Sequence, residues 1–450
     1  MNLPPALKSL LMKPVQPHVM GLFRIIFGAL MIYEIIDYFR IGLIRNMFVL
    51  PAINFKYDFL AWLKPLPETA FNLLLGILLI AACCITLGVF FKWACRIFAT
   101  GYLYIFLLDK SIYNNHIYLF ILLAILLSLT DADKLLSLNP NKKKGFLIPY
   151  WQQILIQFQF AIVYFYGGLA KLRPDWLLDC QPMKSLVANF PSDHLLAPFI
   201  KNDFGIYFFS YGGVVLDLAA SFLLWNKRLK KWAVIPIIIF HVINSIIFRD
   251  IGIFPYVMIF SLIVFFTPDE LPYLKRIVKT ERDKKSTMKK SMTRISILDS
   301  KMPVYFIGLF ILFQLFFPLR GYFLPNHQDW TTIGNRFSWR MKIDTRGIDR
   351  LAFKVMDNDK KQEIPVQVNT WINQMQILNL SMDPRSVKDF ASLLKEKAEQ
   401  SGITNPSVFA DIQVHYNGRE KQHFIAADRD LTTVSYSPFR KLDWVLIIDN

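Results

Sequence analysis

A series of long apolar segments constrains the fold of this chain more than any other feature. Of its 450 residues, 54% are hydrophobic and the mean hydropathy is +0.34, which is too apolar for an ordinary soluble protein. Several segments are shorter than the ~20 residues that a helix needs to cross a membrane directly. These segments must either be extended by flanking polar turns or be re-entrant and shielded from lipid by neighbouring helices. The sequence predicts an all-α polytopic membrane bundle of about nine spans. The segments lie at residues 21–39, 72–91, 97–108, 117–129, 152–170, 206–225, 233–248, 252–267 and 303–319.

The distribution of basic residues predicts the orientation of the bundle. With the N-terminus in the cytoplasm, the connections on the cytoplasmic side hold 22 Lys and Arg residues, whereas those on the opposite side hold 10. Cytoplasmic loops of membrane proteins carry the excess of Lys and Arg. We therefore predict a multi-pass membrane protein whose C-terminal region lies on the extracytoplasmic side.

The region after residue 319 has a different character, because polar and apolar residues alternate in short runs between turn signals. We predict two domains, a membrane bundle over residues 1–319 and an extramembrane, β-rich domain of mixed α and β structure over residues 320–450. SWRMKID (338–344) and RLAFKVMD (350–357) are typical of strands, and residues 383–402 of an amphipathic helix ended by Gly402. Alternation on both sides of Asn417-Gly418 predicts a hairpin.

Charge and cysteine content exclude two classes of site. The net charge of +17 arises from short basic clusters between apolar segments, a pattern of membrane proteins that argues against a nucleic-acid partner. The four cysteines lack both zinc-ligand spacing and a disulfide framework, and three of them lie in or beside apolar segments. No metal site is expected.

Polar residues at membrane depth are costly, so the few that occur are candidates for function. Lys171 follows Gly167 and Gly168 at the end of an apolar segment, and glycines let helices approach closely. Its ammonium could merely reach the headgroups. In an apolar pocket, desolvation would instead favour the neutral amine, which could serve as a general base toward a phenol-like hydroxyl.

Two further polar groups lie in similar positions. Asn115 and His116 begin an apolar segment, where they either belong to a wet loop or face a cavity. His241 and Asn244 share one helix face inside another segment, and such a histidine is often only a hydrogen-bonding partner of a neighbouring helix. Together with Lys171 they outline an outward-opening, lipid-facing site.

Ordered motifs along the chain resemble the vitamin K-dependent gamma-glutamyl carboxylases and their carboxylase-like relatives. The resemblance covers the chain from about residue 20 to its end, and it fits a bacterial homologue. The motifs are GLFRIIFG (21–28), LDKSIYNNHIYL (108–119), YFYGGLAKLRPDW (164–176), FHVINS with IGIFPYVM (240–258), DWTTIGNRFSWRM (329–341) and SYSPFRKLDW (435–444).

The resemblance implies a specific chemistry. A lysine deprotonates reduced vitamin K, which reacts with O2 to give a base strong enough to remove a proton from the γ-carbon of a peptide glutamate. CO2 then adds to that carbon, and the quinone leaves as its epoxide. Lys171 occupies the position of the catalytic base, Asn115 and His116 match the catalytic Asn-His pair, and His241 matches the intramembrane histidine.

The resemblance also implies partners and a peptide-binding segment. The cofactors would be phylloquinol or menaquinol, O2 and CO2, and the partners a glutamate-containing peptide or protein and the lipid bilayer. Trp330, Ser338 and Trp339 match a segment implicated in glutamate binding, Asn335 lies within it, and Arg346 falls in register after it. Each of the matching residues could equally belong to a strand packed on the bundle.

Three residues depart from the animal enzymes. Ala170 replaces a second lysine, Asn335 a tyrosine near the glutamate and quinone sites, and Asp344 a histidine. These differences keep two alternatives to peptide carboxylation open. One is a naphthohydroquinone epoxidase that does not carboxylate peptides, and the other is a non-catalytic quinone- or lipid-binding membrane protein.

Overall fold

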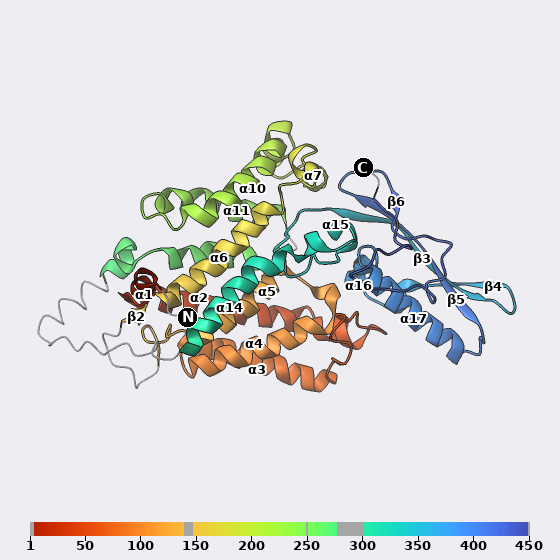
Figure 1. The fold of residues 1–450 in the computed structure, drawn as a ribbon, viewed down its shortest axis with the longest axis horizontal. Coiled ribbons are helices and arrows are strands. Elements are labelled where there is room, and N and C mark those ends of the chain that lie inside the picture. The colour runs from red at the N-terminus through yellow and green to blue at the C-terminus, as the bar shows by residue number, and fades with distance from the viewer. Residues whose placement is uncertain (1–3, 139–146, 249–250, 277–300, 449–450) are drawn as a thin grey trace, which may run out of the picture.

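A computed structural model describes residues 4–138, 147–248, 251–276 and 301–448, of which 301–304 are described by their backbone alone. Figure 1 shows a helical bundle joined at one end to a smaller region that contains a sheet. The elements of the bundle are α1 (Pro5–Leu11), β1 (Pro14–Val15), α2 (His18–Arg40), η1 (Arg45–Val49), α3 (Glu68–Leu87), α4 (Phe91–Leu108), η2 (Lys110–Ile112), α5 (Asn115–Ser128), β2 (Ile148–Pro149), α6 (Trp151–Leu169), α7 (Pro174–Leu177), α8 (Met183–Ala188), α9 (Ala197–Ile200), α10 (Asp203–Leu223), α11 (Lys230–Ile247), α12 (Phe254–Ser261), η4 (Leu262–Phe265), η5 (Pro268–Glu270), α14 (Lys301–Phe316) and η7 (Phe317–Phe323).

The C-terminal region follows η7 and is built around an antiparallel sheet. Its elements are α15 (Gln328–Thr331), β3 (Arg346–Asp357), β4 (Gln362–Val366), η8 (Val368–Thr370), α16 (Gln374–Leu380), α17 (Pro384–Gln400), β5 (Pro406–Tyr416) and β6 (Gln422–His423). The strand order is β4-β3-β5-β6, and the long β3–β5 pair runs from Arg346 opposite Tyr416 to Asp357 opposite Pro406. A bulge interrupts this pair between Ile348 and Arg350.

Six helices within the described residues are long and apolar enough to cross a membrane, which indicates a multi-pass membrane protein. They are His18–Arg40, Glu68–Leu87, Phe91–Leu108, Asp203–Leu223, Lys230–Ile247 and Tyr305–Phe323. All nine predicted segments fall on helices, but a count of nine spans is not confirmed. The helix Asn115–Ser128 and the run Phe254–Phe265 are shorter, and α6 has four glutamines in its first half.

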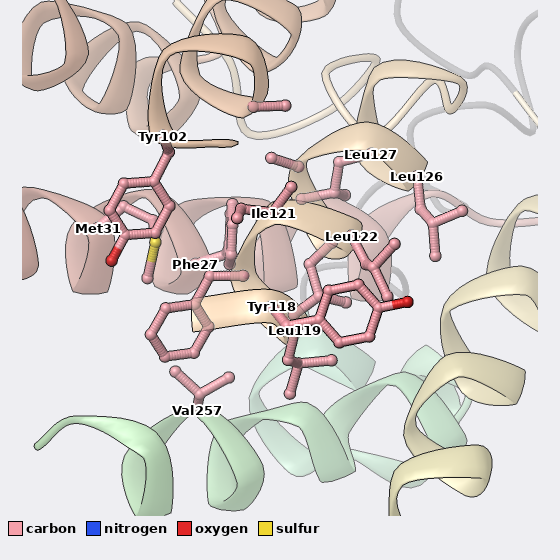
Figure 2. Close-up of a cluster of buried hydrophobic side chains, with 14 of the residues drawn as sticks. Phe27, Met31, Tyr102, Tyr118, Leu119, Ile121, Leu122, Leu126, Leu127 and Val257 are labelled. Atoms are coloured by element: carbon pink, nitrogen blue, oxygen red, sulfur yellow. The ribbon is translucent and has the colours of Figure 1, made fainter. Parts of the chain in front are cut away.

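The short helix α5 lies at the centre of the bundle. Ten of its fourteen residues are buried, from Tyr118 to Ala124 and from Leu126 to Ser128. A helix that is apolar on all sides is buried, either in a protein core or in lipid. Figure 2 shows α5 side chains packed against Phe27 and Met31 of α2, Tyr102 of α4 and Val257 of α12. This burial explains how so short a helix is accommodated.

Three predictions for the C-terminal region are confirmed. RLAFKVMD lies in β3, and the amphipathic segment forms α17, whose N-cap is Asp383 and which is followed by Gly402 with a φ of +91°. Asn417 and Gly418 both have positive φ and form the centre of a turn, closed by a hydrogen bond from Arg419 N to Tyr416 O, between the antiparallel strands β5 and β6. One face of the sheet packs on α17, where the rings of Phe353 and Phe390 meet at 5.0 Å.

The prediction of a strand over SWRMKID is wrong, because neighbouring residues of this segment make tertiary contacts with different parts of the protein. Trp339 is fully buried among the helices, whereas Arg340 makes an ion pair with Asp329. Trp339 and Lys342 have φ values of +56° and +50°, in the left-handed region. Such conformations cost about 1–3 kcal/mol each and break the extended geometry of a strand.

Buried ion pairs connect the bundle to the C-terminal region. Lys110 Nζ donates to Asp383 Oδ1 at 3.0 Å, and Arg336 also donates to Asp383, at 2.8 Å. On the other side, Asp175 accepts hydrogen bonds from Arg419 at 2.9 and 3.1 Å. These contacts place the C-terminal region against the end of the bundle where α4 and α6 finish and α5 begins.

Candidate active site

A cavity lies at the end of the bundle that contacts the C-terminal region. Its empty volume is about 1090 Å³, including the part that opens to solvent. The walls come from the start of α5, the end of α6, α7, the start of α8, α10, the second half of α11 and α12, and the segment 340–342 also contributes. Four predicted site residues, from segments far apart in sequence, line it together: Asn115, His116, Lys171 and His241.

Lys171 lies two residues beyond the end of α6, with its side chain buried. Its ammonium donates to Gly167 O at 3.1 Å and forms a short hydrogen-bonded ion pair with Asp217 of α10. Nζ lies 5.3 Å from the centre of the Trp176 ring. The pocket around this lysine therefore contains a carboxylate that faces the amine, in addition to apolar side chains.

Asp217 is not among the predicted site residues, although its position in the sequence carries a signal. It is a single acidic residue within the apolar run YGGVVLDLAASFLL (211–224), and an acid at membrane depth is costly unless it is paired. It lines the cavity beside Lys171. The same reasoning that selects Lys171 and His241 thus applies to Asp217.

The glycine pair before Lys171 has the predicted effect on helix packing. A Cβ at Gly168 would lie 2.7 Å from Leu218 Cγ and 3.0 Å from the Leu218 backbone nitrogen. A Cβ at Gly167 would lie 3.4 Å from Asp217 Oδ2. The absence of side chains therefore lets α6 and α10 approach closely enough for Lys171 to reach Asp217.

The two histidines both contact the Phe254 ring, His116 in a stacked and His241 in an edge-to-face arrangement. The centroid of that ring is 6.0 Å from the imidazole of His116 and 6.3 Å from that of His241. His241 is buried, and its Nε2 makes a 2.9 Å hydrogen bond with the Tyr164 hydroxyl. Its Nδ1 has no hydrogen-bond partner among the described residues. This nitrogen is a buried polar atom available to a ligand in the cavity.

Asn115 connects the cavity wall to the segment 340–342. Its Nδ2 donates to Arg340 O at 2.9 Å, and its Oδ1 accepts a hydrogen bond from the Tyr113 hydroxyl, also at 2.9 Å. The preceding residue, Asn114, caps α5 by accepting from His116 N. The Asn-His pair is therefore held at a helix start and against the mouth of the cavity.

The residues predicted to bind glutamate do not line the cavity. Trp330 is buried against Tyr416 and Phe424 and donates to Leu446 O at 2.8 Å, whereas Trp339 stacks on Tyr118 at 4.8 Å. The guanidinium of Arg346 donates to Trp330 O and lies over the Trp330 ring. These three side chains support packing between the sheet, α15 and the bundle.

The last two residues of this group take part in the turn that precedes the mouth. Ser338 Oγ donates to Gly334 O at 2.9 Å and accepts from Arg320, while Asn335 N donates to Thr332 O within a partly exposed turn. The cavity is lined instead by Arg340, Met341 and Lys342, which sequence reasoning did not select.

A charged network lies between the mouth and the C-terminal region. Arg340 donates twice to Asp329, at 2.8 and 2.7 Å, and Arg173 donates to the same carboxylate at 2.7 Å. Burial alone would raise the pKa of Asp175, but hydrogen bonds from Arg419 and Asn417 and the charge of Arg173 lower it. The backbone next to Lys171 is therefore anchored by ion pairs.

The lining of the cavity suits an aromatic ligand with polar edges. Phe240, Phe248, Phe254 and Met258 form an apolar wall, and Lys171, Asp217 and His241 provide polar groups. Pockets for small molecules generally combine an apolar lining with a few placed polar groups. In the part of the chain that the structure describes, no group of three or more His, Cys, Asp or Glu side chains is arranged to hold a metal ion.

Comparison with known protein families gives a match for each of the two regions of the chain. Residues 12–269 match the HTTM domain, and residues 299–450 match the lumenal domain of vitamin K-dependent gamma-carboxylase. No solved structure matches the chain. The two matches follow each other in the order bundle then C-terminal region and together span most of the sequence. The chain therefore belongs to the vitamin K-dependent gamma-carboxylase family.

Proposed function

We propose that this protein is an integral-membrane gamma-glutamyl carboxylase that converts peptide glutamate to gamma-carboxyglutamate. The coupled reaction would be oxidation of reduced vitamin K, as phylloquinol or menaquinol, to its epoxide with O2, while CO2 supplies the new carboxyl group. The observation that carries this proposal is the convergence of Asn115, His116, Lys171 and His241 on one cavity.

The cavity has the features that a reduced naphthoquinone requires. Its apolar wall from α11 and α12 would hold the ring system, and the polar groups at Lys171 and His241 would meet the ring hydroxyls. The unpartnered Nδ1 of His241, within the described residues, provides one hydrogen-bonding position. When bound, the reduced quinone would supply, together with O2, the strong base that glutamate deprotonation needs.

The side chains of this protein have separate tasks in the proposed reaction. Lys171 would accept a proton from a ligand hydroxyl, for which it is buried and fixed through Gly167 and Asp217. His241, held by Tyr164, would hydrogen-bond the oxygen on which negative charge develops. Asn115 would keep the start of α5, and with it His116, against the mouth.

The peptide would reach this site from the C-terminal region. We propose that residues 320–450 form an extracytoplasmic domain and that the cavity opens on the same side, with the N-terminus in the cytoplasm. The cavity is at the end of the bundle that contacts this region, and segment 340–342 contributes to both. A peptide on the C-terminal region would thus lie close to the cavity mouth.

One observation favours a second candidate function, naphthohydroquinone epoxidation without peptide carboxylation. Trp330, Trp339 and Arg346, which resemble residues of a glutamate-binding segment, are buried in packing contacts and do not line the cavity. The polar groups around Lys171 do line it. The hydroquinone half of the reaction therefore has more direct support than the glutamate half.

A paired assay tests the proposal. Purified protein in lipid nanodiscs would receive reduced vitamin K, O2, labelled bicarbonate and a glutamate peptide, and both epoxide and fixed label would be measured. We expect both products from the unchanged protein. Lys171→Ala should lower both by roughly 100-fold or more, because a positioned general base contributes about 10²–10⁴. Lys360→Ala, at a side chain that is 72% exposed, is the matched control and should leave both rates unchanged.

The outcomes separate the three hypotheses. Epoxide without fixed label would establish the second candidate and contradict the first. Quinone binding without either product would indicate a non-catalytic quinone- or lipid-binding protein. A folded Lys171→Ala variant with full epoxide formation would refute the role of Lys171 whichever reaction is catalysed.

A further inference from the structure

Asp217 is placed to act together with Lys171. It lies within the membrane helix α10, with its side chain 8% exposed, and it is the only carboxylate among the described residues that line the cavity. Its partner is the Lys171 ammonium, whose side chain is 7% exposed. A charge pair this far from water persists only with close geometry and additional hydrogen bonds.

The surroundings fix both partners of the pair. Gly167 leaves space for the carboxylate, because a Cβ at that position would lie 3.4 Å from Asp217 Oδ2. The same residue accepts a hydrogen bond from Lys171 through its carbonyl oxygen. Trp176 covers the ammonium, and its indole is held by a 2.7 Å hydrogen bond to Ser210 O on α10. The amine therefore has a defined position relative to the cavity.

We propose that Lys171 and Asp217 form a single proton-accepting dyad, in which Asp217 positions the amine and shares its proton. This inference rests on the proposed function of Lys171 as the base. The resting dyad consists of a neutral amine, a carboxylate and one proton shared between them. Its net charge is zero. A lone buried lysine would have to lose its ammonium proton before it could act.

The proton balance of the dyad is simple. An acidic ligand hydroxyl loses its proton, the O–H bond electrons remain on the ligand oxygen, and the proton forms a new bond on the dyad. The dyad then holds two protons, as ammonium and carboxylic acid, and carries one positive charge beside the new negative charge on the ligand. Neither charge is left uncompensated in the buried site.

Chemical labelling of the amine tests the dyad without any catalysed reaction. Protein in nanodiscs at neutral pH would be treated with acetic anhydride, and modification of Lys171 would be quantified by peptide mass analysis. Asp217→Asn should raise the labelling rate of Lys171 by about tenfold or more, because removal of an opposite charge favours the neutral amine. Asp217→Glu should restore protection. Asp203→Asn, an exposed acid on the same helix, should have no effect.

Kinetics distinguish a dyad from a merely structural pair. Asp217→Asn should lower kcat for epoxide formation by roughly 100-fold with little change in KM, and should move the acid limb of the pH profile to higher pH. An acid limb that moves to lower pH would show that the free amine alone is the base. Equal Lys171 labelling in the unchanged protein and in Asp217→Asn would overturn the inference.

A stability measurement covers the case in which Asp217→Asn folds poorly. The double variant Lys171→Gln, Asp217→Asn should then recover the unfolding temperature, because it removes the uncompensated ammonium as well. Failure to recover would contradict a charge pair. If the unchanged protein forms no epoxide, the proposed function fails, while the labelling and stability results still decide whether the two groups share a proton.

Discussion

Asp383 is the residue at which three elements meet. Its carboxylate is 6% exposed and accepts hydrogen bonds from Lys110 of the bundle, from Arg336 and from the backbone of Ser386 at the start of α17. Burial alone would raise the pKa of Asp383, but the charges of Lys110 and Arg336 lower it to about 2. The charged carboxylate is therefore stabilised in the folded protein.

This shift predicts acid sensitivity. Because the pKa of about 2 in the folded state lies below the ordinary value of about 3.9, the contribution of Asp383 to stability is present above that value and is lost as the pH falls toward 2. Its size is on the order of 2–3 kcal/mol. We expect the unfolding temperature of the detergent-solubilised protein to fall across this range, with a shallower dependence in Asp383→Asn.

The same variant should be less stable at neutral pH. Removing one partner of a buried ion pair costs about 3–5 kcal/mol, because Lys110 and Arg336 both lose the carboxylate to which they donate. Asp443→Asn is the control, since this 79% exposed residue pairs only loosely with Arg429, at 3.9 Å, and should change stability by less than about 1 kcal/mol. Equal effects of the two substitutions would contradict the importance of burial.

At the residue scale, the sequence identifies polar groups that lie within apolar segments, but it does not identify the residues that pair with them. Lys171 and His241 could be selected because an ionisable group in an apolar segment is costly. Asp217 gives the same signal, yet its pairing with Lys171 depends on how closely α6 and α10 approach. The predicted role of Trp330 and Arg346 in glutamate binding stays a prediction, because the structure shows only their packing contacts and their absence from the cavity lining.

At the element scale, the contact between α6 and α10 determines the geometry of the site. Gly168→Ala should separate these helices, because the new methyl group would lie within 3.0 Å of Leu218 backbone and side-chain atoms. The Lys171–Asp217 pair would lengthen, so we expect lower epoxide formation and a lower unfolding temperature. Epoxide assays and thermal unfolding in detergent would measure both effects.

Gly212→Ala is the matched control for this substitution. Gly212 lies in α10, the partner helix of α6, but a Cβ at that position would have no atom of the described residues within 4 Å. Its replacement by alanine should be neutral or slightly stabilising, since alanine has the higher helix propensity. If Gly168→Ala proved as harmless as Gly212→Ala, the close approach would not be needed to position Lys171.

An element can be predicted from its local sequence pattern where no distant contact competes with that pattern. The amphipathic period of α17 and the Asn417-Gly418 turn both specify their structure without distant partners. Polar and apolar residues alternate in SWRMKID as they do in a strand. However, Trp339 stacks on Tyr118 and donates to Gln314 of the bundle, and Arg340 donates to Asp329. Such tertiary contacts override a local pattern and cannot be inferred from it.

At the scale of the whole molecule, the charge distribution predicts an orientation. The basic loop around Lys227 lies at the junction of α10 and α11, whereas the cavity lies toward the opposite ends of these two helices. Basic connections prefer the cytoplasmic side. The cavity and the C-terminal region should then both face the extracytoplasmic side, where a peptide substrate would have to arrive.

Thiol accessibility tests this orientation. The four native cysteines, all free, would be replaced by serine, and single cysteines would be introduced as Lys421→Cys or Lys227→Cys, both at exposed positions. In right-side-out vesicles, a membrane-impermeant maleimide should label position 421 directly, and position 227 only after detergent is added. The reverse pattern would place the cavity in the cytoplasm, away from extracytoplasmic peptides, and would contradict the proposed topology while leaving the Lys171 chemistry open.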